Sequence, residues 1–117
     1  MPYVDGFVLA VPKRNLDAYK ALARKAGKVW MEHGALSYVE CEGDDVPAGE
    51  VTSFPRAVQA KDDEIVIFSW VTYESRAKRD EVMKKVMADE RMKGDEYKTV
   101  FDGKRMIFGG FESFMEL

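Results

Sequence analysis

The chain contains 117 residues, of which 46% are hydrophobic and 33% charged, and its formal net charge at pH 7 is −3. This length predicts one domain, residues 1–117, built around one hydrophobic core. The lone cysteine, Cys41, excludes a disulfide framework and a cysteine-rich zinc site, and favours a cytoplasmic location. The slight acidity argues against a nucleic-acid partner. No apolar run reaches the roughly 20 residues that span a bilayer, and residues 1–11 do not resemble a signal peptide, so we expect no membrane association.

The first part of the chain predicts a strand followed by a helix. Residues 3–11 (YVDGFVLAV) form an apolar run between two prolines, which is typical of a strand. Gly34 suits a left-handed cap at the end of the helix, whereas Gly27 inside it costs about 1 kcal/mol relative to alanine. Between residues 13 and 33 apolar side chains recur every three or four positions, as in an amphipathic helix; they are Leu16, Tyr19, Leu22, Ala23, Ala26, Trp30 and His33.

The middle of the chain predicts two further strands separated by a long loop. Residues 35–42 alternate well enough for a strand, and the turn-rich stretch 43–51 follows them. Residues 53–60 predict a short extended segment, which Pro55 would place at a sheet edge. The strongest strand signal is IVIFSWVT, at residues 65–72.

The last part of the chain predicts a second helix and a final strand. Ser75 is a suitable N-cap for a helix that runs to about Met92. Residues 95–103 look irregular, and residues 105–114 (RMIFGGFESF) predict a strand. We expect the inner face of the second helix to carry Met83, Val86 and Met87.

The element order is therefore β-α-β, a loop, and β-α-β. Two such split units form an antiparallel sheet with both helices on one face, which is the ferredoxin-like α+β fold. The sequence contains no internal repeat and no linker between domains.

Alternation along each strand divides the side chains into two sets, one for each face of the sheet. We assign a set of small residues, among them Val4, Gly6, Val8 and Ala10, to the helix side. The opposite face would then be open to water, and a soluble monomer does not tolerate so large an apolar patch. A second copy is the simplest cover, so we predict a homodimer with a ligand cavity between the two sheets. In the alternative, a monomer, residues 43–60 fold over the sheet. The predicted open face carries Tyr3, Phe7, Tyr38, Phe68, Trp70, Met106 and Phe108.

Three carboxylates accompany these aromatic residues on the predicted face. Asp5, Glu40 and Glu112 are the candidate catalytic residues, because desolvated carboxylates serve as general acids or bases or hold a cation. Our hypothesis is that Asp5 and Glu112 share the cavity. In the alternative, the acids lie at strand ends in water or pair with Arg56 or Arg105.

The other reactive residue types favour structural interpretations. His33 is expected to pack or to place a charge at the helix C-terminus. Cys41 is expected to be an inert, buried thiol on the helix side. The acidic residues between 40 and 50 lack the spacing of an EF-hand, so we predict no metal site. The sequence contains no phosphate-binding loop or nucleophile elbow and predicts no cofactor.

The segments YVDGFVLAVP, GALSYVEC, IVIFSWV, DERMK and FDGKRMIFGGFES resemble the YbaA-like family of small uncharacterised bacterial proteins, a domain of unknown function. The resemblance covers essentially the whole chain and is most specific over residues 101–113. It implies the dimeric α/β-barrel superfamily, in which two ferredoxin-like protomers pack their sheets into one barrel. Elsewhere in that superfamily are cofactorless monooxygenases, haem-degrading enzymes, dehydratases and ligand-sensing modules, which rely on Asn, His and Trp in the cavity. Here Asn15 lies near a helix start and Trp70 alone is well placed, which weakens a monooxygenase or haem assignment.

Three functional interpretations follow. The first is a homodimer that binds a small, partly aromatic molecule between its sheets. The second is a cofactorless enzyme, monooxygenase-like or isomerase-like, that transfers a proton on such a molecule. The third is a purely structural dimer whose own side chains fill the cavity. Fold analogy does not choose among them, because this superfamily hosts unrelated functions.

Overall fold

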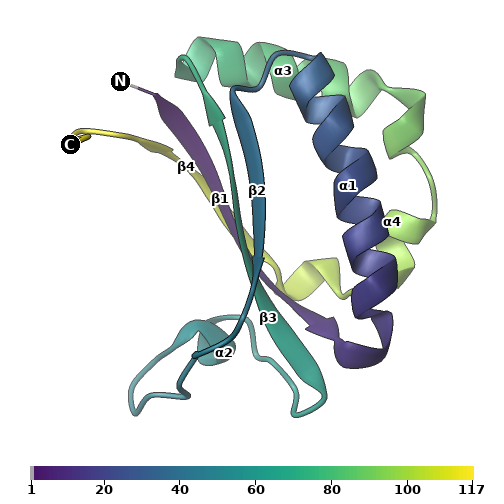
Figure 1. The fold of residues 1–117 in the computed structure, drawn as a ribbon, viewed down its shortest axis with the longest axis vertical. Coiled ribbons are helices and arrows are strands. Elements are labelled where there is room, and N and C mark those ends of the chain that lie inside the picture. Colours follow the sequence, from purple (N-terminus) through teal and green to yellow (C-terminus); the bar gives the residue numbers. More distant parts are fainter. Residues whose placement is uncertain (1) are drawn as a thin grey trace.

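The structure is a computed structural model that describes residues 2–117, and it consists of one antiparallel sheet with the two long helices on one side (Figure 1). In the described chain the strands are β1 (Tyr3–Pro12), β2 (Ser37–Glu42), β3 (Glu64–Tyr73) and β4 (Ile107–Glu112), in the spatial order β2-β3-β1-β4. The helices are α1 (Leu16–Glu32), α2 (Phe54–Ala57), α3 (Arg76–Ala88) and α4 (Glu96–Thr99). This arrangement is ferredoxin-like, and it confirms the predicted fold class.

The predicted ends of the long helices are mostly confirmed. Gly34 has a φ of +117°, the left-handed conformation expected just after α1. The Ser75 hydroxyl accepts a hydrogen bond from the backbone N–H of Lys78 at 3.1 Å, as an N-cap does. The second helix was predicted to reach Met92, but α3 ends at Ala88 because Asp89 is extended and caps a separate 3₁₀ turn.

Two segments differ from the predictions. Residues 53–60 were expected to be extended, but they contain α2, in which Ser53 accepts the backbone N–H of Arg56 at 3.1 Å. Pro55 lies in the first turn of this helix, where its missing N–H costs nothing. Residues 95–103 were expected to be irregular, but they contain the short helix α4.

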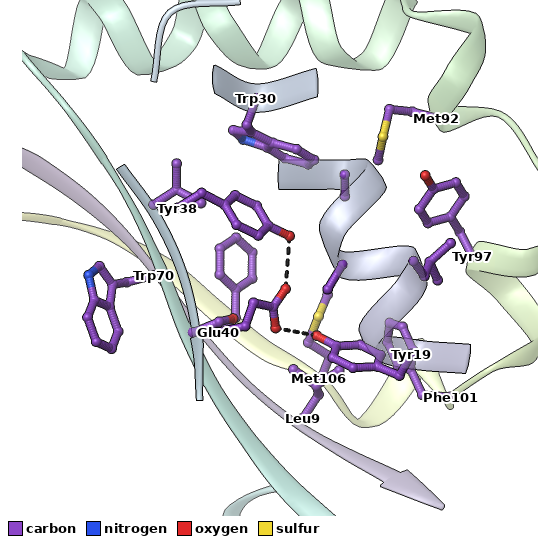
Figure 2. Close-up of a pocket in the computed structure, with 16 residues that line it drawn as sticks. Leu9, Tyr19, Trp30, Tyr38, Glu40, Trp70, Met92, Tyr97, Phe101 and Met106 are labelled. Atoms are coloured by element: carbon purple, nitrogen blue, oxygen red, sulfur yellow. Dashed lines mark hydrogen bonds between the residues drawn. The ribbon is translucent and has the colours of Figure 1, made fainter. Parts of the chain in front are cut away.

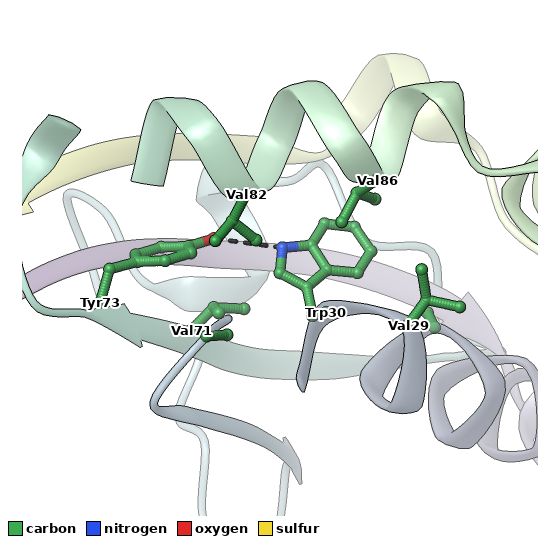
Figure 3. Packing of buried hydrophobic residues seen from close by; sticks show 8 residues of the cluster. Val29, Trp30, Val71, Tyr73, Val82 and Val86 are labelled. Atoms are coloured by element: carbon green, nitrogen blue, oxygen red, sulfur yellow. Dashed lines mark hydrogen bonds between the residues drawn. The ribbon is translucent and has the colours of Figure 1, made fainter. Parts of the chain in front are cut away.

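The core lies between the sheet and the two long helices (Figure 3). Trp30 of α1 reaches across it, and its indole N–H donates to the Tyr73 hydroxyl at 3.1 Å. On α3 the fully buried residues are Val82 and Val86, four positions apart on one face. Met87, which was predicted to face inward, is 58% exposed, because it lies about 100° round the helix from Val86.

The strand pairing overturns the predicted division of the sheet faces. In the β1–β3 register, Asp5 pairs with Val71 and Phe7 with Ser69, so odd-numbered residues of both strands share the helix side. The predicted division had combined even-numbered β1 residues with odd-numbered β3 residues. The small set of β1, Val4 to Ala10, therefore faces away from the helices.

Residues 43–60, which the monomer alternative places over the sheet, cover part of the face away from the helices. Val58 is fully buried against Val8, Ala10 and Val66 at one end of the sheet. α2 lies on this side of the sheet (Figure 1), and Phe54 packs edge-on against Phe68 with ring centroids 5.8 Å apart. The rest of this face, which we call the open face, remains accessible; it carries Val4, Val39, Phe68, Trp70, Ile107 and Phe111.

Within residues 2–117, no helix has the length and apolar character needed to cross a bilayer.

A buried ion pair joins the start of β3 to the segment before β4. Both Nη atoms of Arg105 donate to the Glu64 carboxylate at 2.7 Å, and the Glu64 side chain is only 3% exposed. Arg105 also donates to the Gln59 carbonyl and to Asp102. Hydrogen bonds from Arg105 lower the pKa of Glu64 from 4.5 to about 2.

We expect Glu64→Gln to lower the free energy of unfolding by about 2 kcal/mol at pH 7. Because the pKa of Glu64 is lower in the folded chain than in the unfolded chain, its contribution is present above about pH 4.5 and is lost as pH falls towards 2. Urea unfolding at several pH values should therefore show the variant and the wild type converging in acid. The control is Asp63→Asn, which breaks the exposed Arg14–Asp63 pair and should change stability by less than about 0.5 kcal/mol. A difference for Glu64→Gln that stays constant with pH would contradict this assignment.

Candidate functional site

An apolar cavity of about 170 Å³ lies between α1 and the helix side of the sheet (Figure 2). Strands β1, β2 and β3 form its floor, and α1 forms one wall. The segment from the end of α3 to β4 closes the remaining side. Its lining side chains include Phe7, Leu9, Tyr19, Leu22, Ala23, Ala26, Trp30, Tyr38, Glu40, Met92, Tyr97, Phe101 and Met106.

The wall from α1 is the apolar stripe that the sequence predicted. Tyr19, Leu22, Ala26 and Trp30 are all buried and recur at helical spacing. The large residues of the stripe lie at its two ends, and the small side chains of Ala23 and Ala26 lie between them. The cavity therefore lies beside the small side chains of the stripe.

A carboxylate and two tyrosine hydroxyls form the polar centre of the cavity wall. Glu40 and Tyr38 are two positions apart on β2, so both side chains point to the helix side. Glu40 accepts hydrogen bonds from the Tyr19 hydroxyl at 2.6 Å and from the Tyr38 hydroxyl at 2.9 Å (Figure 2). We call these residues the Tyr19–Glu40–Tyr38 trio.

The two tyrosines of the trio remain hydrogen-bond donors over the physiological pH range. Burial raises the pKa of Tyr19 and of Tyr38 well above the usual 10.0, and the neighbouring charge of Glu40 raises both further. Each hydroxyl therefore keeps its proton and presents it to the Glu40 carboxylate.

Gly27 allows the Tyr38 ring to lie close to α1. A Cβ atom at position 27 would be 2.9 Å from Cδ1 of Tyr38, which is closer than real Cβ contacts. The cost of glycine in the middle of the helix is thus linked to the position of Tyr38, and through Tyr38 to that of Glu40.

The segment that closes the cavity is tied to both ends of α1. Near the start of α1, the Asn15 side chain donates to the Val100 carbonyl at 2.9 Å, and Phe101 packs edge-on against Tyr19. Near its end, His33 Nε2 lies 2.9 Å from an Asp89 carboxylate oxygen. His33 therefore packs at the helix C-terminus, in agreement with the structural interpretation.

The three predicted carboxylates lie in three different surroundings. Glu40 lines the cavity, whereas Glu112 is exposed at the end of β4. Asp5 is 5% exposed beneath α3, where Arg79 Nη1 donates to it at 3.0 Å. Burial raises the pKa of Asp5 and the Arg79 charge opposes that rise. Asp5 and Glu112 do not share the cavity, because neither lines it: Asp5 is buried beside Arg79, and Glu112 is exposed.

The predicted aromatic residues are divided between the two sides of the sheet. Tyr3, Phe7, Tyr38 and Phe108 belong to the helix side, because their strand partners are the odd-numbered β1 and β3 residues. Of these four, Phe7 and Tyr38 line the cavity. Tyr3 instead stacks under the Arg79 guanidinium, 4.9 Å from its ring centroid.

The remaining predicted aromatic residues, Phe68 and Trp70, lie on the open face with ring centroids 5.6 Å apart. The Trp70 ring points away from the cavity (Figure 2). Cys41 also differs from its prediction: its thiol is exposed rather than buried against the helices, because it alternates with Glu40 on β2. Among the described residues, no cluster of three or more His, Cys, Asp or Glu side chains could hold a metal ion.

Several residues of the cavity carry no sequence pattern that marks them as site residues. Tyr19 was placed on the α1 stripe but was not linked to Glu40, which is 21 positions away. Met92, Tyr97 and Phe101 come from a segment predicted in part to be irregular. The signal available in the sequence was the spacing Tyr38-x-Glu40, which places an aromatic hydroxyl and a carboxylate on one face of a strand.

The fold and cavity together define a ferredoxin-like α+β protein with a mainly apolar site between the sheet and its helices. A solved structure described as a dimeric ferredoxin-like protein, from an uncultured marine organism, superimposes with a TM-score of 0.64 over 100% of both chains, at 13% sequence identity. At that identity the likeness concerns the fold alone.

The chain belongs to the DUF1428 family of proteins of unknown function, whose model matches residues 2–103. It is 52% identical over 116 residues to the uncharacterized protein YbaA of Escherichia coli strain K12 and to that of Shigella flexneri, covering 99% of each chain. The family resemblance seen in the sequence is thus confirmed, and the function of the relatives is likewise uncharacterised.

We expect Glu40→Ala to lower the free energy of unfolding by about 2 kcal/mol, because it leaves two part-buried tyrosine hydroxyls without their acceptor. Glu42→Ala is the matched control, since Glu42 lies on the same strand and the same face but forms an exposed pair with Lys20. It should cost less than about 0.5 kcal/mol. Urea unfolding of both variants measures the difference, and equal losses would show that the trio does not stabilise the cavity wall.

Proposed function

We propose that the protein binds a small apolar molecule, about the size of one aromatic ring, in the cavity between α1 and the sheet. The observation that carries this proposal is a mainly apolar cavity of about 170 Å³ with one carboxylate and its two tyrosine partners in the wall. Ligand sites commonly combine an apolar lining with a few convergent polar groups. An engineered apolar cavity of about 150 Å³ in another protein accepts benzene, so the volume suits a single ring.

The proposed ligand position lies inside each protomer, whereas the sequence-based hypothesis placed it between two sheets. The reason is the strand register, which turns Phe7, Tyr38 and Glu40 towards α1. The proposed ligand itself, a small and partly aromatic molecule, is unchanged.

Filling the cavity should abolish binding. Ala26→Leu places a larger side chain in the cavity wall. We expect the wild type to bind toluene and the variant to bind it at least tenfold more weakly. Ala21→Leu is the matched control, because Ala21 lies on the exposed side of α1. Ligand-observed NMR titration measures the affinities. If the wild type shows no saturable toluene binding, or if Ala26→Leu binds toluene as tightly as Ala21→Leu does, the cavity is not a ligand site. Such a result would support the interpretation of the protein as a purely structural dimer.

A second candidate function is proton transfer, with Glu40 as the general base. Glu40 favours it, because its carboxylate lines the cavity in which a substrate would sit. However, both tyrosine hydroxyls donate to this carboxylate, so accepting a proton from a substrate requires breaking one of these hydrogen bonds. Ligand binding is therefore the better supported function.

We also propose that the protein is a homodimer whose protomers pack through their open faces. Phe68, Ile107 and Phe111 are 43%, 45% and 65% exposed on this face, and residues 43–60 cover only one end of it. A contiguous apolar patch of this kind is typical of an interface. The likeness to a protein described as dimeric and ferredoxin-like supports the same assembly.

Two phenylalanines of β4 on opposite faces test the interface. Phe111→Asp places a charge on the open face and should convert the dimer to monomers, because a buried, unpaired charge is strongly unfavourable. Phe108→Asp is the matched control: Phe108 is 72% exposed but faces the helix side, so this variant should remain dimeric. Sedimentation velocity distinguishes the two. A dimer that survives Phe111→Asp and dissociates with Phe108→Asp would assign the interface to the other face.

A further inference from the structure

We propose, resting on the proposed ligand site, that the ligand is an amphipathic anion: its apolar ring fills the cavity and its acidic group lies outside, against Arg24 and Lys28 of α1. Three features carry this inference. They are a groove that adjoins the cavity, the basic side chains along that groove, and the way in which the acidic side chains of the groove are already engaged.

The first feature is a groove of about 770 Å³ between α1 and the edge strand β2. It shares four lining residues with the inner cavity: Tyr19, Ala23, Tyr38 and Glu40. The Tyr19–Glu40–Tyr38 trio therefore forms a partition, with the apolar cavity on one side and the open groove on the other. Ala23 is the one shared residue outside the trio, and we place the passage of a longer ligand from the cavity into the groove beside it.

The second feature is a row of basic side chains on α1. Lys20, Arg24 and Lys28 line the groove and follow one another at intervals of four residues, so they form a single row along the helix. Ala23 and Gly27, which precede Arg24 and Lys28, are the small residues of α1 that line the groove. The row therefore runs beside the place where the groove meets the cavity.

The third feature is the engagement of the acidic side chains of this groove. Glu42 pairs with Lys20 at 2.7 Å, and Glu32 pairs with Arg91 at 2.6 Å. Glu40 is held by the two tyrosines. Within residues 2–117, Arg24 and Lys28 have no carboxylate within ion-pair distance. Two positive charges at the mouth of the site thus remain available for an anion on the ligand.

Electrostatics also decides which end of the ligand enters the cavity. An anionic group inside it would lose its hydration in an apolar lining and would approach the carboxylate of Glu40. The same group in the groove stays hydrated and faces Arg24 and Lys28. The ring therefore enters, and the acid remains outside.

The test compares two probes that differ in charge and little in shape, 3-phenylpropionate and 3-phenylpropanol. We expect the carboxylate to bind the wild-type protein about tenfold more tightly than the alcohol at low ionic strength. This preference should decrease as salt is added, because the charges in the groove are exposed to solvent. Isothermal titration calorimetry measures both affinities.

The double variant Arg24→Gln/Lys28→Gln should remove most of the preference for the carboxylate and leave the affinity for the alcohol unchanged. Both positions are exposed, so the fold should be retained, and circular dichroism checks this. The control is Arg76→Gln/Lys84→Gln, which removes one arginine and one lysine from exposed positions on α3. This variant should keep the preference for the carboxylate over the alcohol.

The outcomes separate this inference from the proposed function. If toluene and the alcohol bind but the carboxylate has no advantage, or keeps its advantage in Arg24→Gln/Lys28→Gln, the anionic ligand is excluded and the apolar site stands. If neither phenyl probe nor toluene binds the wild type, both the site and the inference are overturned.

Discussion

The antiparallel register between β1 and β3 is the constraint on which the other features of this protein depend. β1 and β3 are the two central strands, and their pairing extends over residues 3–12 and 64–73. A change of register by one residue would exchange the two faces of one strand relative to the other. The observed register places Leu9 and Ile67 together against α1 and leaves Phe68 on the open face. The cavity beneath the helices and the apolar surface behind the sheet are both consequences of this single choice.

The candidate site combines this register with a close approach between α1 and β2. Gly27 admits the Tyr38 ring, and Tyr38 together with Tyr19 holds the carboxylate of Glu40. Each tyrosine supplies an apolar ring to the cavity and a hydroxyl to the acid, so a charged group is accommodated in an otherwise apolar wall. By contrast, Asp5 pairs with the Arg79 guanidinium and Glu64 with the Arg105 guanidinium. Among these three acids, only Glu40 lines the cavity, and its partners are neutral hydroxyl donors rather than a cation.

The sequence predicted the helices and strands more accurately than it predicted which side chains lie on each face of them. The α1 stripe, the Gly34 cap, the Ser75 cap and the four strands all follow from local patterns, because periodicity and capping depend on neighbours within a few residues. The helix at residues 54–57 was missed because Pro55 suits both a sheet edge and the first turn of a helix. Met87 was misplaced because α3 has charged residues on most sides and hence a weak apolar stripe.

The sequence alone determined the ferredoxin-like order of elements and the family. It also indicated that two helices leave one face of the sheet uncovered, although it did not give the residues of that face correctly. Alternation within a strand also established that Tyr38 and Glu40 share one face. Only the tertiary structure decided which residues of different strands lie on the same side, since alternation has a period of two and does not specify the register between strands. It therefore decided that Phe7 and Tyr38 line the cavity while Phe68 and Trp70 belong to the open face, and that Glu40 contacts Tyr19, which is 21 positions away in the sequence.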